Sequence, residues 1–126
     1  MGARGGSVLV IEDDEALLTL FERILIEAGF EFRAATTTEG ARALIARRRF
    51  DIVVCDLSVP GEENVFDFIS GLRKQIPRIA ALIITGFAPD EVLSQAKTLK
   101  MDVLEKPFSP PDLIQRICCL LDRKAA

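Results

Sequence analysis

The stretch from Asp51 to Asp56 is the feature that most constrains what this chain can fold into. Its middle, Ile52 to Cys55, is an uninterrupted apolar run, which is typical of a strand buried on both faces of a parallel sheet. The run stops at the carboxylate of Asp56, and Leu57 to Gly61 follows as a turn-forming segment. The sequence therefore predicts an acidic side chain at the carboxyl end of a central strand, which is where open α/β sheets bind ligands.

Short apolar runs and amphipathic windows alternate along the rest of the chain. A strand is expected at each apolar run, at residues 7–11, 30–35, 52–55, 80–84 and 102–105. Each run is followed by a window whose apolar residues recur at three- and four-residue spacing, as in a helix with one buried face. These strand–helix pairs with short connections predict a single-domain α/β sandwich, in which a five-stranded parallel sheet is flanked by five helices.

Polar and glycine residues indicate where the first two helices begin and end. Asp13 or Asp14 can cap the first helix, and Gly29 follows its last turn. Thr36 and Glu39 have the spacing of a capping box, so the second helix is expected to begin at Thr36.

Composition and charge exclude several classes of function. A chain of 126 residues with 49% hydrophobic residues predicts one globular domain over 7–122, with a flexible lead-in at 1–6 and a tail at 123–126. The net charge of −3 and the isoelectric point near 5.0 argue against direct nucleic-acid binding. No apolar run approaches membrane-spanning length and the start is too polar for a secretory signal, so we expect a cytoplasmic protein that does not contact membranes.

The cysteines and the missing histidine narrow the chemistry further. Cys55, Cys118 and Cys119 are an odd number of cysteines without the spacing of a metal site, and they are interpreted as buried, reduced thiols. Cys55 is expected to pack in the core on the strand face opposite Asp56. Because the chain contains no histidine, Ser–His, Cys–His and zinc–histidine chemistry are excluded within it.

Reactive side chains stand at the ends of four of the expected strands. Glu12 and Asp13 follow the first, Asp56 ends the third, Thr85 ends the fourth and Lys106 follows the fifth. Parallel strands bring these ends to one edge of the sheet. Two carboxylates about 4 Å apart repel by about 4 kcal/mol at an effective dielectric constant near 20. A hard divalent cation such as Mg²⁺ relieves this repulsion and keeps coordination places open for water and phosphate oxygens.

The chain resembles the receiver domains of two-component response regulators. The resemblance runs from about Val8 to Leu121, and no single motif in it is specific; it depends on five pieces that occur in order, each at a strand end. The matching pieces are Glu12-Asp13, Asp56, Pro60-Gly61, Thr85-Gly86 and Lys106-Pro107-Phe108.

This resemblance implies a flavodoxin-like fold with strand order 2-1-3-4-5 and a role for each matching residue. Asp56 would accept a phosphoryl group from a phosphohistidine on a sensor histidine kinase or a phosphotransfer protein. Glu12, Asp13, Asp56 and the main-chain carbonyl of Ser58 would hold Mg²⁺, or Mn²⁺ in its place. Thr85 and Lys106 would bind the attached phosphoryl group, and the Lys106–Pro107 bond would be cis.

The resemblance also implies how the chain works in signalling. Phosphorylation would switch a surface formed by the fourth helix, fifth strand and fifth helix, which then docks a partner or forms a homodimer. The chain would not be an enzyme acting on other substrates, since it catalyses only its own phosphorylation and dephosphorylation.

Four positions depart from the common pattern of this family or vary within it. Asn64 stands where a glycine is frequent, and its tolerance of a left-handed backbone would preserve the turn. Val103 stands where an aromatic residue is frequent, which weakens an aromatic-rotamer account of switching. Ser58 and Phe87 would flank the phosphoryl group, and we hypothesise that Phe87 slows the hydrolysis of phospho-Asp56 relative to a Phe87→Glu variant.

Three other functions fit parts of the sequence. A magnesium-dependent phosphatase with an aspartyl-phosphate intermediate typically has a second aspartate where this chain has Ser58. A flavin-binding module of similar fold would have a phosphate-binding loop after the first strand, where the acidic stretch Glu12–Glu15 repels phosphate. A receiver that has lost its chemistry and only docks partners is disfavoured by the intact acidic, threonine and lysine positions.

Overall fold

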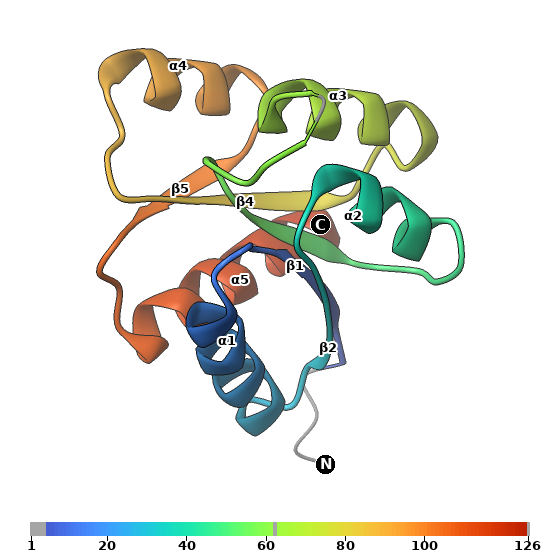
Figure 1. Cartoon of the computed structure of the whole chain (residues 1–126), viewed down its shortest axis with the longest axis vertical. Helices are drawn as coiled ribbons and strands as arrows, with labels where there is room; N and C mark the ends of the chain where they lie inside the picture. Colours follow the sequence, from blue (N-terminus) through green and yellow to red (C-terminus); the bar gives the residue numbers. More distant parts are fainter. Residues whose placement is uncertain (1–4, 62, 126) are drawn as a thin grey trace.

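The structure is a computed structural model that describes residues 5–61 and 63–125. A parallel sheet of five strands in the order β2-β1-β3-β4-β5 forms its middle layer (Figure 1). The strands are β1 (Ser7–Ile11), β2 (Glu31–Ala35), β3 (Ile52–Asp56), β4 (Ala80–Thr85) and β5 (Asp102–Glu105). The predicted parallel sheet and its strand order are confirmed, with β3 paired to β1 and β4 on its two sides.

Helices cover both faces of this sheet. They are α1 (Glu15–Glu27), α2 (Thr38–Ile45), α3 (Val65–Gln75), α4 (Asp90–Thr98) and α5 (Pro110–Ala125). Helices α2, α3 and α4 contribute buried side chains to the core on one face, and α1 and α5 contribute to the core on the other (Figure 1). The chain is therefore a three-layer α/β sandwich, as the alternation of strand-like and helical segments predicts.

Strand β3 is the central strand of the sheet, and every one of its residues is buried. Val53 and Cys55 point into the core beneath α2, α3 and α4, whereas Ile52 and Val54 point into the core beneath α1 and α5. An apolar run without polar interruption is what such a two-sided environment requires. The prediction that Cys55 packs in the core is confirmed. Burial raises the pKa of its thiol, and the carboxylates of Asp56 and Glu12 raise it further.

The helix caps agree with the sequence at α1 and differ from it at α2. Asp14 caps α1 by accepting a hydrogen bond from the amide of Leu17 at 3.1 Å, and Gly29 follows that helix with a φ of 91°. At α2 the cap is Thr37, whose hydroxyl accepts from the amide of Gly40 at 3.0 Å. The capping box expected from Thr36 was therefore wrong by one residue. The residue three after the true cap is a glycine, which has no side chain to reach back.

Two further expectations need correction. Asn64 has a φ of −73°, so its tolerance of a left-handed backbone is not used; it caps α3 by accepting from the amide of Asp67 at 2.9 Å. Of the two cysteines on α5, Cys118 is half-buried and Cys119 is exposed, so the expectation of buried thiols fails for Cys119. Positions on a two-sided strand are buried whatever their parity, whereas positions on a surface helix depend on the helix phase.

The described part of the chain contains no helix that is both long enough and apolar enough to cross a membrane. Of the expected lead-in at 1–6, only residues 5 and 6 are described. The division of the chain into lead-in, domain and tail stays an expectation.

Candidate functional site

The carboxyl ends of the strands gather buried polar side chains at one edge of the sheet. Among the described residues, the buried polar side chains are Glu12, Thr38, Asp56 and Thr85, and three of these stand at or just beyond strand ends. Asp56 is the last residue of β3 and pairs with Ile84 of β4, next to Thr85. Glu12 follows β1 directly, beside β3. The sheet register thus places these side chains on adjacent strands, as the sequence predicts.

Asp56 is the centre of this group. Its Oδ2 forms an ion pair with Nζ of Lys106, which arrives from the end of β5. Its Oδ1 accepts hydrogen bonds from the amide of Ser58 at 2.8 Å and from the Ser58 hydroxyl at 2.7 Å. Burial by itself would raise the pKa of Asp56, but the bonds from Lys106 and Ser58 outweigh it and hold this pKa below its usual value. The carboxylate is therefore ionised at neutral pH although only 4% of it is exposed.

Glu12 lies beside Asp56 in a less favourable environment. Its Oε2 accepts from the amide of Asp14 at 3.1 Å. Its Oε1 lies 3.6 Å from Nζ of Lys106 and is buried without a hydrogen-bond partner in the described part of the chain. Burial raises the pKa of Glu12 to about 7, and the neighbouring Asp56 carboxylate contributes to the rise. Near neutral pH this carboxyl group is thus poised between its two protonation states.

Lys106 supplies the positive charge for both acids. Burial alone would lower the pKa of Lys106, but its contacts with Asp56 and Glu12 raise it above its usual value. Its amide donates to the carbonyl of Thr85 at 2.8 Å, which ties the end of β5 to the end of β4. The Lys106–Pro107 peptide bond is cis, as the resemblance implied.

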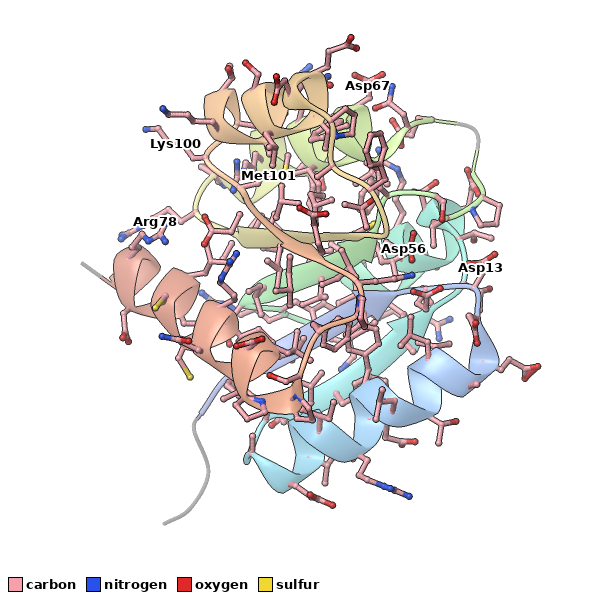
Figure 2. The ribbon with its side chains drawn as sticks, turned by 90° about the vertical axis from the view of Figure 1, so that its left-hand side faces the viewer. Asp13, Asp56, Asp67, Arg78, Lys100 and Met101 are labelled. Atoms are coloured by element: carbon pink, nitrogen blue, oxygen red, sulfur yellow. The ribbon has the colours of Figure 1, made fainter. Side chains whose placement is uncertain are left out.

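Thr85 and Asp13 lie at the same edge but are not joined to this cluster. The Thr85 hydroxyl donates to the carbonyl of Phe87 at 2.8 Å and accepts from the amide of Phe87 at 3.2 Å, so it is turned toward its own loop. Asp13 is exposed, and it lies at the same end of the sheet as Asp56 (Figure 2). No three Asp, Glu, Cys or His side chains among the described residues lie close enough together to form a ready metal site.

The donor set nevertheless fits a hard cation. Glu12 offers a buried carboxylate oxygen that accepts no hydrogen bond from any residue the structure describes, although Lys106 lies 3.6 Å away, and such an atom costs free energy unless a partner satisfies it. Asp56 offers two more carboxylate oxygens next to it, and oxygen atoms are the ligands that Mg²⁺ takes. Of the expected ligands, the structure brings Glu12 and Asp56 together and leaves Asp13 at the rim.

Sequence reasoning missed two contacts around Asp56. The Ser58 hydroxyl binds Asp56 directly, whereas only the main-chain carbonyl of Ser58 was expected to act. A hydroxyl residue two positions after a strand-end carboxylate is a sequence signal for this bond, since Asp and Ser side chains commonly bond within such turns. Gly61 packs so closely on α2 that a Cβ there would come within 2.2 Å of the Thr38 hydroxyl oxygen. The loop after Asp56 can therefore approach α2 this closely only because Gly61 has no side chain.

Comparisons with known proteins agree with this geometry. The family model of the response regulator receiver domain matches residues 8–118. The alginate biosynthesis transcriptional regulatory protein AlgB of Pseudomonas aeruginosa is 32% identical over 109 residues, which are 86% of this chain and 24% of that protein. Protein PetR of Rhodobacter capsulatus is 32% identical over 126 residues, which are 98% of this chain and 52% of that protein. The chain thus spans about half or less of these curated relatives.

Solved structures give the same result. A CheY-like response regulator receiver domain protein from Methanospirillum hungatei JF-1 superposes with a TM-score of 0.86 at 26% identity, covering 95% of this chain and 96% of that one. The receiver domain of the Francisella response regulator 1452 superposes with a TM-score of 0.83 at 28% identity, covering 94% and 98%. The chain belongs to the receiver domains of two-component response regulators, a signalling family whose general function is phosphotransfer.

Proposed function

We propose that Asp56 is the phosphoacceptor of this receiver domain and takes a phosphoryl group from a phosphohistidine on a sensor histidine kinase or a phosphotransfer protein. The observation that carries the proposal is the buried carboxylate of Asp56 at the end of the central strand, ion-paired to Lys106 and adjacent to Glu12. A buried carboxylate that stays ionised is a nucleophile, and its surroundings can neutralise an incoming phosphoryl group.

The transfer needs little covalent chemistry from the rest of the site. A bond forms between an Asp56 carboxylate oxygen and phosphorus while the phosphorus–nitrogen bond of the phosphohistidine breaks and its electron pair returns to the imidazole. Because hydrogen bonds from Ser58 and Lys106 hold the pKa of Asp56 low, the nucleophile requires no separate base at neutral pH. The Lys106 ammonium then pairs with a phosphoryl oxygen, and this compensates the charge added to the site.

Receiver domains generally bind Mg²⁺ for phosphorylation, and here Glu12, Asp13, Asp56 and the main-chain carbonyl of Ser58 would hold it, or Mn²⁺ in its place. When bound, the ion supplies positive charge to the phosphoryl oxygens. Glu12 must be ionised to serve as a ligand, and its pKa of about 7 makes its availability depend on pH.

Thr85 would change its hydrogen-bond partner when Asp56 is phosphorylated. Its hydroxyl is engaged with the amide and carbonyl of Phe87, so binding a phosphoryl oxygen requires it to exchange its donated bond. That exchange would release the β4–α4 loop and bias the surface of α4, β5 and α5, which docks a partner or a second copy of the chain. Val103, on β5, packs against the core at the position where an aromatic switch residue is frequent, so the loop itself would carry the signal.

Incubation with Mg²⁺ and acetyl phosphate or phosphoramidate, followed by intact mass measurement, tests the proposal. We expect one phosphate adduct that hydroxylamine removes and that Asp56→Asn abolishes. Asp122→Asn removes an exposed carboxylate from α5 and should leave the adduct unchanged. An adduct of equal yield on the Asp56→Asn variant would contradict the proposal. A Mg²⁺–beryllofluoride complex should also raise the melting temperature of the native protein but not that of Asp56→Asn.

A further inference from the structure

Among the described residues, Thr38 is the one buried polar side chain that has no part in the chemistry proposed for Asp56. It stands in the first turn of α2 and is only 1% exposed. Its hydroxyl donates to Oε2 of the neighbouring Glu39 at 3.3 Å. Its other close neighbour is Gly61, which belongs to the loop between Asp56 and α3.

This loop carries two of the hydrogen bonds that hold the Asp56 carboxylate. The amide and the hydroxyl of Ser58 donate to Asp56 Oδ1 at 2.8 and 2.7 Å. Val59 follows and is buried in the core beneath α2 and α3, and Pro60 comes next with a φ fixed by its ring. Little freedom therefore separates Ser58 from Gly61, and a displacement of Gly61 would be passed on to the bonds at Asp56.

The contact between Gly61 and Thr38 leaves no room for a side chain. A Cβ at Gly61 would lie 2.2 Å from Oγ1 of Thr38, 3.3 Å from its Cβ and 3.4 Å from its Cγ2. The loop backbone thus rests on a buried side chain of α2. The size of Thr38 consequently sets how closely the loop approaches the helix.

Arg42 makes a second contact between α2 and this loop. It stands four residues after Thr38 and so lies on the same face of the helix. Its guanidinium group lies 5.0 Å from the ring centroid of Phe68, and its Nε donates to Oε1 of Glu63 at 3.1 Å, near the end of the loop. The Arg42 and Glu63 side chains are 44% and 34% exposed, so their ion pair contributes less than the buried contact at Thr38.

We propose that Thr38, assisted by Arg42, is a positioning residue for the chemistry at Asp56, because it fixes the loop that places Ser58 against the carboxylate. This role rests on the proposed function, in which the main-chain carbonyl of Ser58 also binds Mg²⁺. A loop that is already in place needs no further ordering when the ion binds, so less Mg²⁺ is required for phosphorylation. Helix α2 thereby acts on the phosphoacceptor from outside the group formed by Glu12, Asp56 and Lys106.

Gly61→Ala tests the contact by adding a methyl group to it. The φ of Gly61 is not positive, so alanine can adopt the same backbone and the loop is displaced only by Thr38. In the metal-free protein we expect the amide resonance of Ser58 to shift in NMR spectra. In phosphorylation by acetyl phosphate, the half-saturating Mg²⁺ concentration should rise about tenfold, while the rate at saturating Mg²⁺ stays within about twofold of native.

Thr38→Ala tests the same contact by deletion, since it removes Oγ1 and Cγ2 and leaves a gap beneath Gly61. Alone it should raise the half-saturating Mg²⁺ concentration about threefold. Combined with Gly61→Ala it should restore a value within about twofold of native, because the added methyl group occupies the gap. The matched control is Gly71→Ala, which adds a methyl group on α3 at an ordinary distance of 3.5 Å from Nη2 of Arg42 and should keep native values.

Contrary results would overturn the role of Thr38. If the effects of Thr38→Ala and Gly61→Ala multiply in the double variant, the two residues act independently. An unchanged Ser58 resonance in Gly61→Ala, or an equal rise in half-saturating Mg²⁺ in Gly71→Ala, would also exclude it. If the native protein forms no phosphate adduct, the proposed function fails, whereas the Ser58 resonance needs neither metal nor phosphate and still decides whether Thr38 positions the loop.

Discussion

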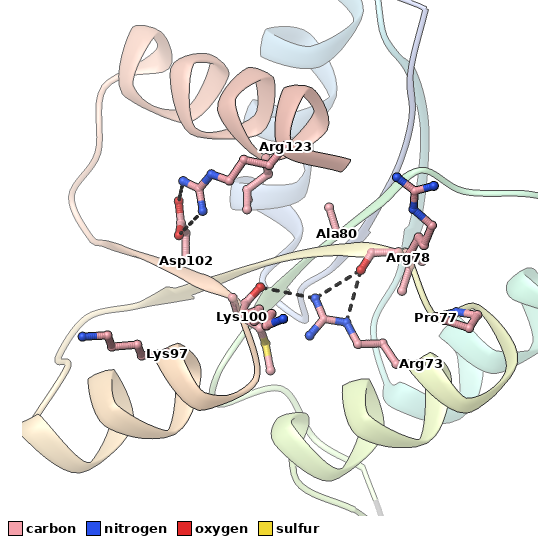
Figure 3. A pocket seen from close by; sticks show the side chains of 11 residues that line it. Arg73, Pro77, Arg78, Ala80, Lys97, Lys100, Asp102 and Arg123 are labelled. Atoms are coloured by element: carbon pink, nitrogen blue, oxygen red, sulfur yellow. Dashed lines mark hydrogen bonds and ion pairs between the residues drawn. The ribbon is translucent and has the colours of Figure 1, made fainter. Parts of the chain in front are cut away.

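The two ends of the sheet hold charge in opposite ways. At the carboxyl end, the buried acids Glu12 and Asp56 both form ion pairs with Lys106. At the amino end, a basic hollow where β4 and β5 begin is lined by five cations and one acid, namely Arg73, Arg78, Lys97, Lys100, Arg123 and Asp102 (Figure 3). Figure 2 shows the separation, with Asp13 and Asp56 at one side of the sheet and Arg78, Lys100 and Met101 at the other.

The partners of the cations at the two ends show which cation can change its partner and which cannot. The Lys106 ammonium is bound to side-chain carboxylates, so it can pair with an incoming phosphoryl group without breaking a hydrogen bond to a main-chain carbonyl. Arg73 is bound to main-chain carbonyls of Ile79, Leu99 and Lys100, so its charge is part of the fold. A cation bound to carboxylates is suited to chemistry, and a cation bound to helix-end carbonyls is suited to stability.

Removing Lys106 should have the largest effect, and the effect should be on chemistry. Lys106→Met keeps the length of the side chain and removes the ammonium group that compensates phosphoryl charge. We expect phosphorylation by acetyl phosphate to slow about 100-fold or more, as for other single electrostatic stabilisers. Time-resolved intact mass measures the rate. Lys97→Met, at the opposite end, should keep the native rate, and a Lys106→Met rate within a factor of two of native would remove Lys106 from the mechanism.

Removing Arg73 should instead lower the stability of the protein and leave the phosphorylation chemistry of Asp56 intact. Arg73→Met leaves the carbonyls at the end of α4 and the start of β4 without their donor, and burial already disfavours the arginine's charged form by lowering its pKa. We expect the free energy of unfolding to fall by about 2 kcal/mol, because the partly buried carbonyls of Ile79 and Leu99 lose their hydrogen-bond donor. Urea denaturation measures it, with the exposed neighbour Lys74→Met as control. Loss of phosphorylation in a variant that is still folded would contradict the division between the two ends.

Glu12 should give a smaller effect whose size depends on pH. Because its pKa rises from 4.5 to about 7 on folding, the folded protein binds the proton more tightly, and ionisation costs stability as pH rises through that interval. In metal-free buffer, Glu12→Gln should therefore unfold at a higher temperature than the native protein at pH 8, whereas the two proteins should unfold at nearly the same temperature at pH 4. The exposed Glu22→Gln variant should show no such change between the two pH values. A gain from Glu12→Gln that is larger at pH 4 would reverse the assigned sign.

Most of the fold could be predicted from the sequence because its strands are buried on both faces. An apolar run such as Ile52 to Cys55 has few alternatives to a central parallel strand, and the residue after each run then falls at one edge of the sheet. For that reason the sequence predicts that Glu12, Asp56 and Lys106 lie close together. Helix starts were less certain, since Thr36 and Thr37 offer the same hydroxyl and only the backbone decides between them.

The contacts that could not be predicted depend on side-chain orientation in turns and on contacts between segments far apart in the sequence. Whether the Thr85 hydroxyl faces Asp56 or its own loop depends on the turn at Phe87, which carries no periodic signal. The basic hollow is built from residues of three helices and two strand starts that are far apart in the sequence. The sequence indicates only that Arg73 is a cation near the end of a helix. The fold brings the carbonyls of Leu99 and Lys100 close enough to accept its hydrogen bonds.

Phe87 should give the smallest effect, and it tests how far the carboxyl end controls water. Its side chain is 73% exposed, and its main chain is bonded in both directions to the Thr85 hydroxyl, so Phe87 lies in the loop after β4, at the same end of the sheet as Asp56. Phe87→Glu would replace an apolar ring by a carboxylate that can accept a hydrogen bond from the attacking water. We expect phospho-Asp56 to hydrolyse about threefold faster in this variant, which corresponds to well under 1.4 kcal/mol in the barrier.

The decay of the phosphate adduct by intact mass, after removal of the donor, measures this difference. Leu93→Glu is the matched control, because Leu93 is another large exposed apolar side chain, 43% exposed, and lies on α4 beyond the loop. If Leu93→Glu accelerates hydrolysis as much as Phe87→Glu does, added negative charge is the cause and the ring has no role. If hydrolysis in the native protein is as fast as in Phe87→Glu or faster, Phe87 does not screen the phosphoryl group from water, and the exposed ring has no part in setting the lifetime of phospho-Asp56.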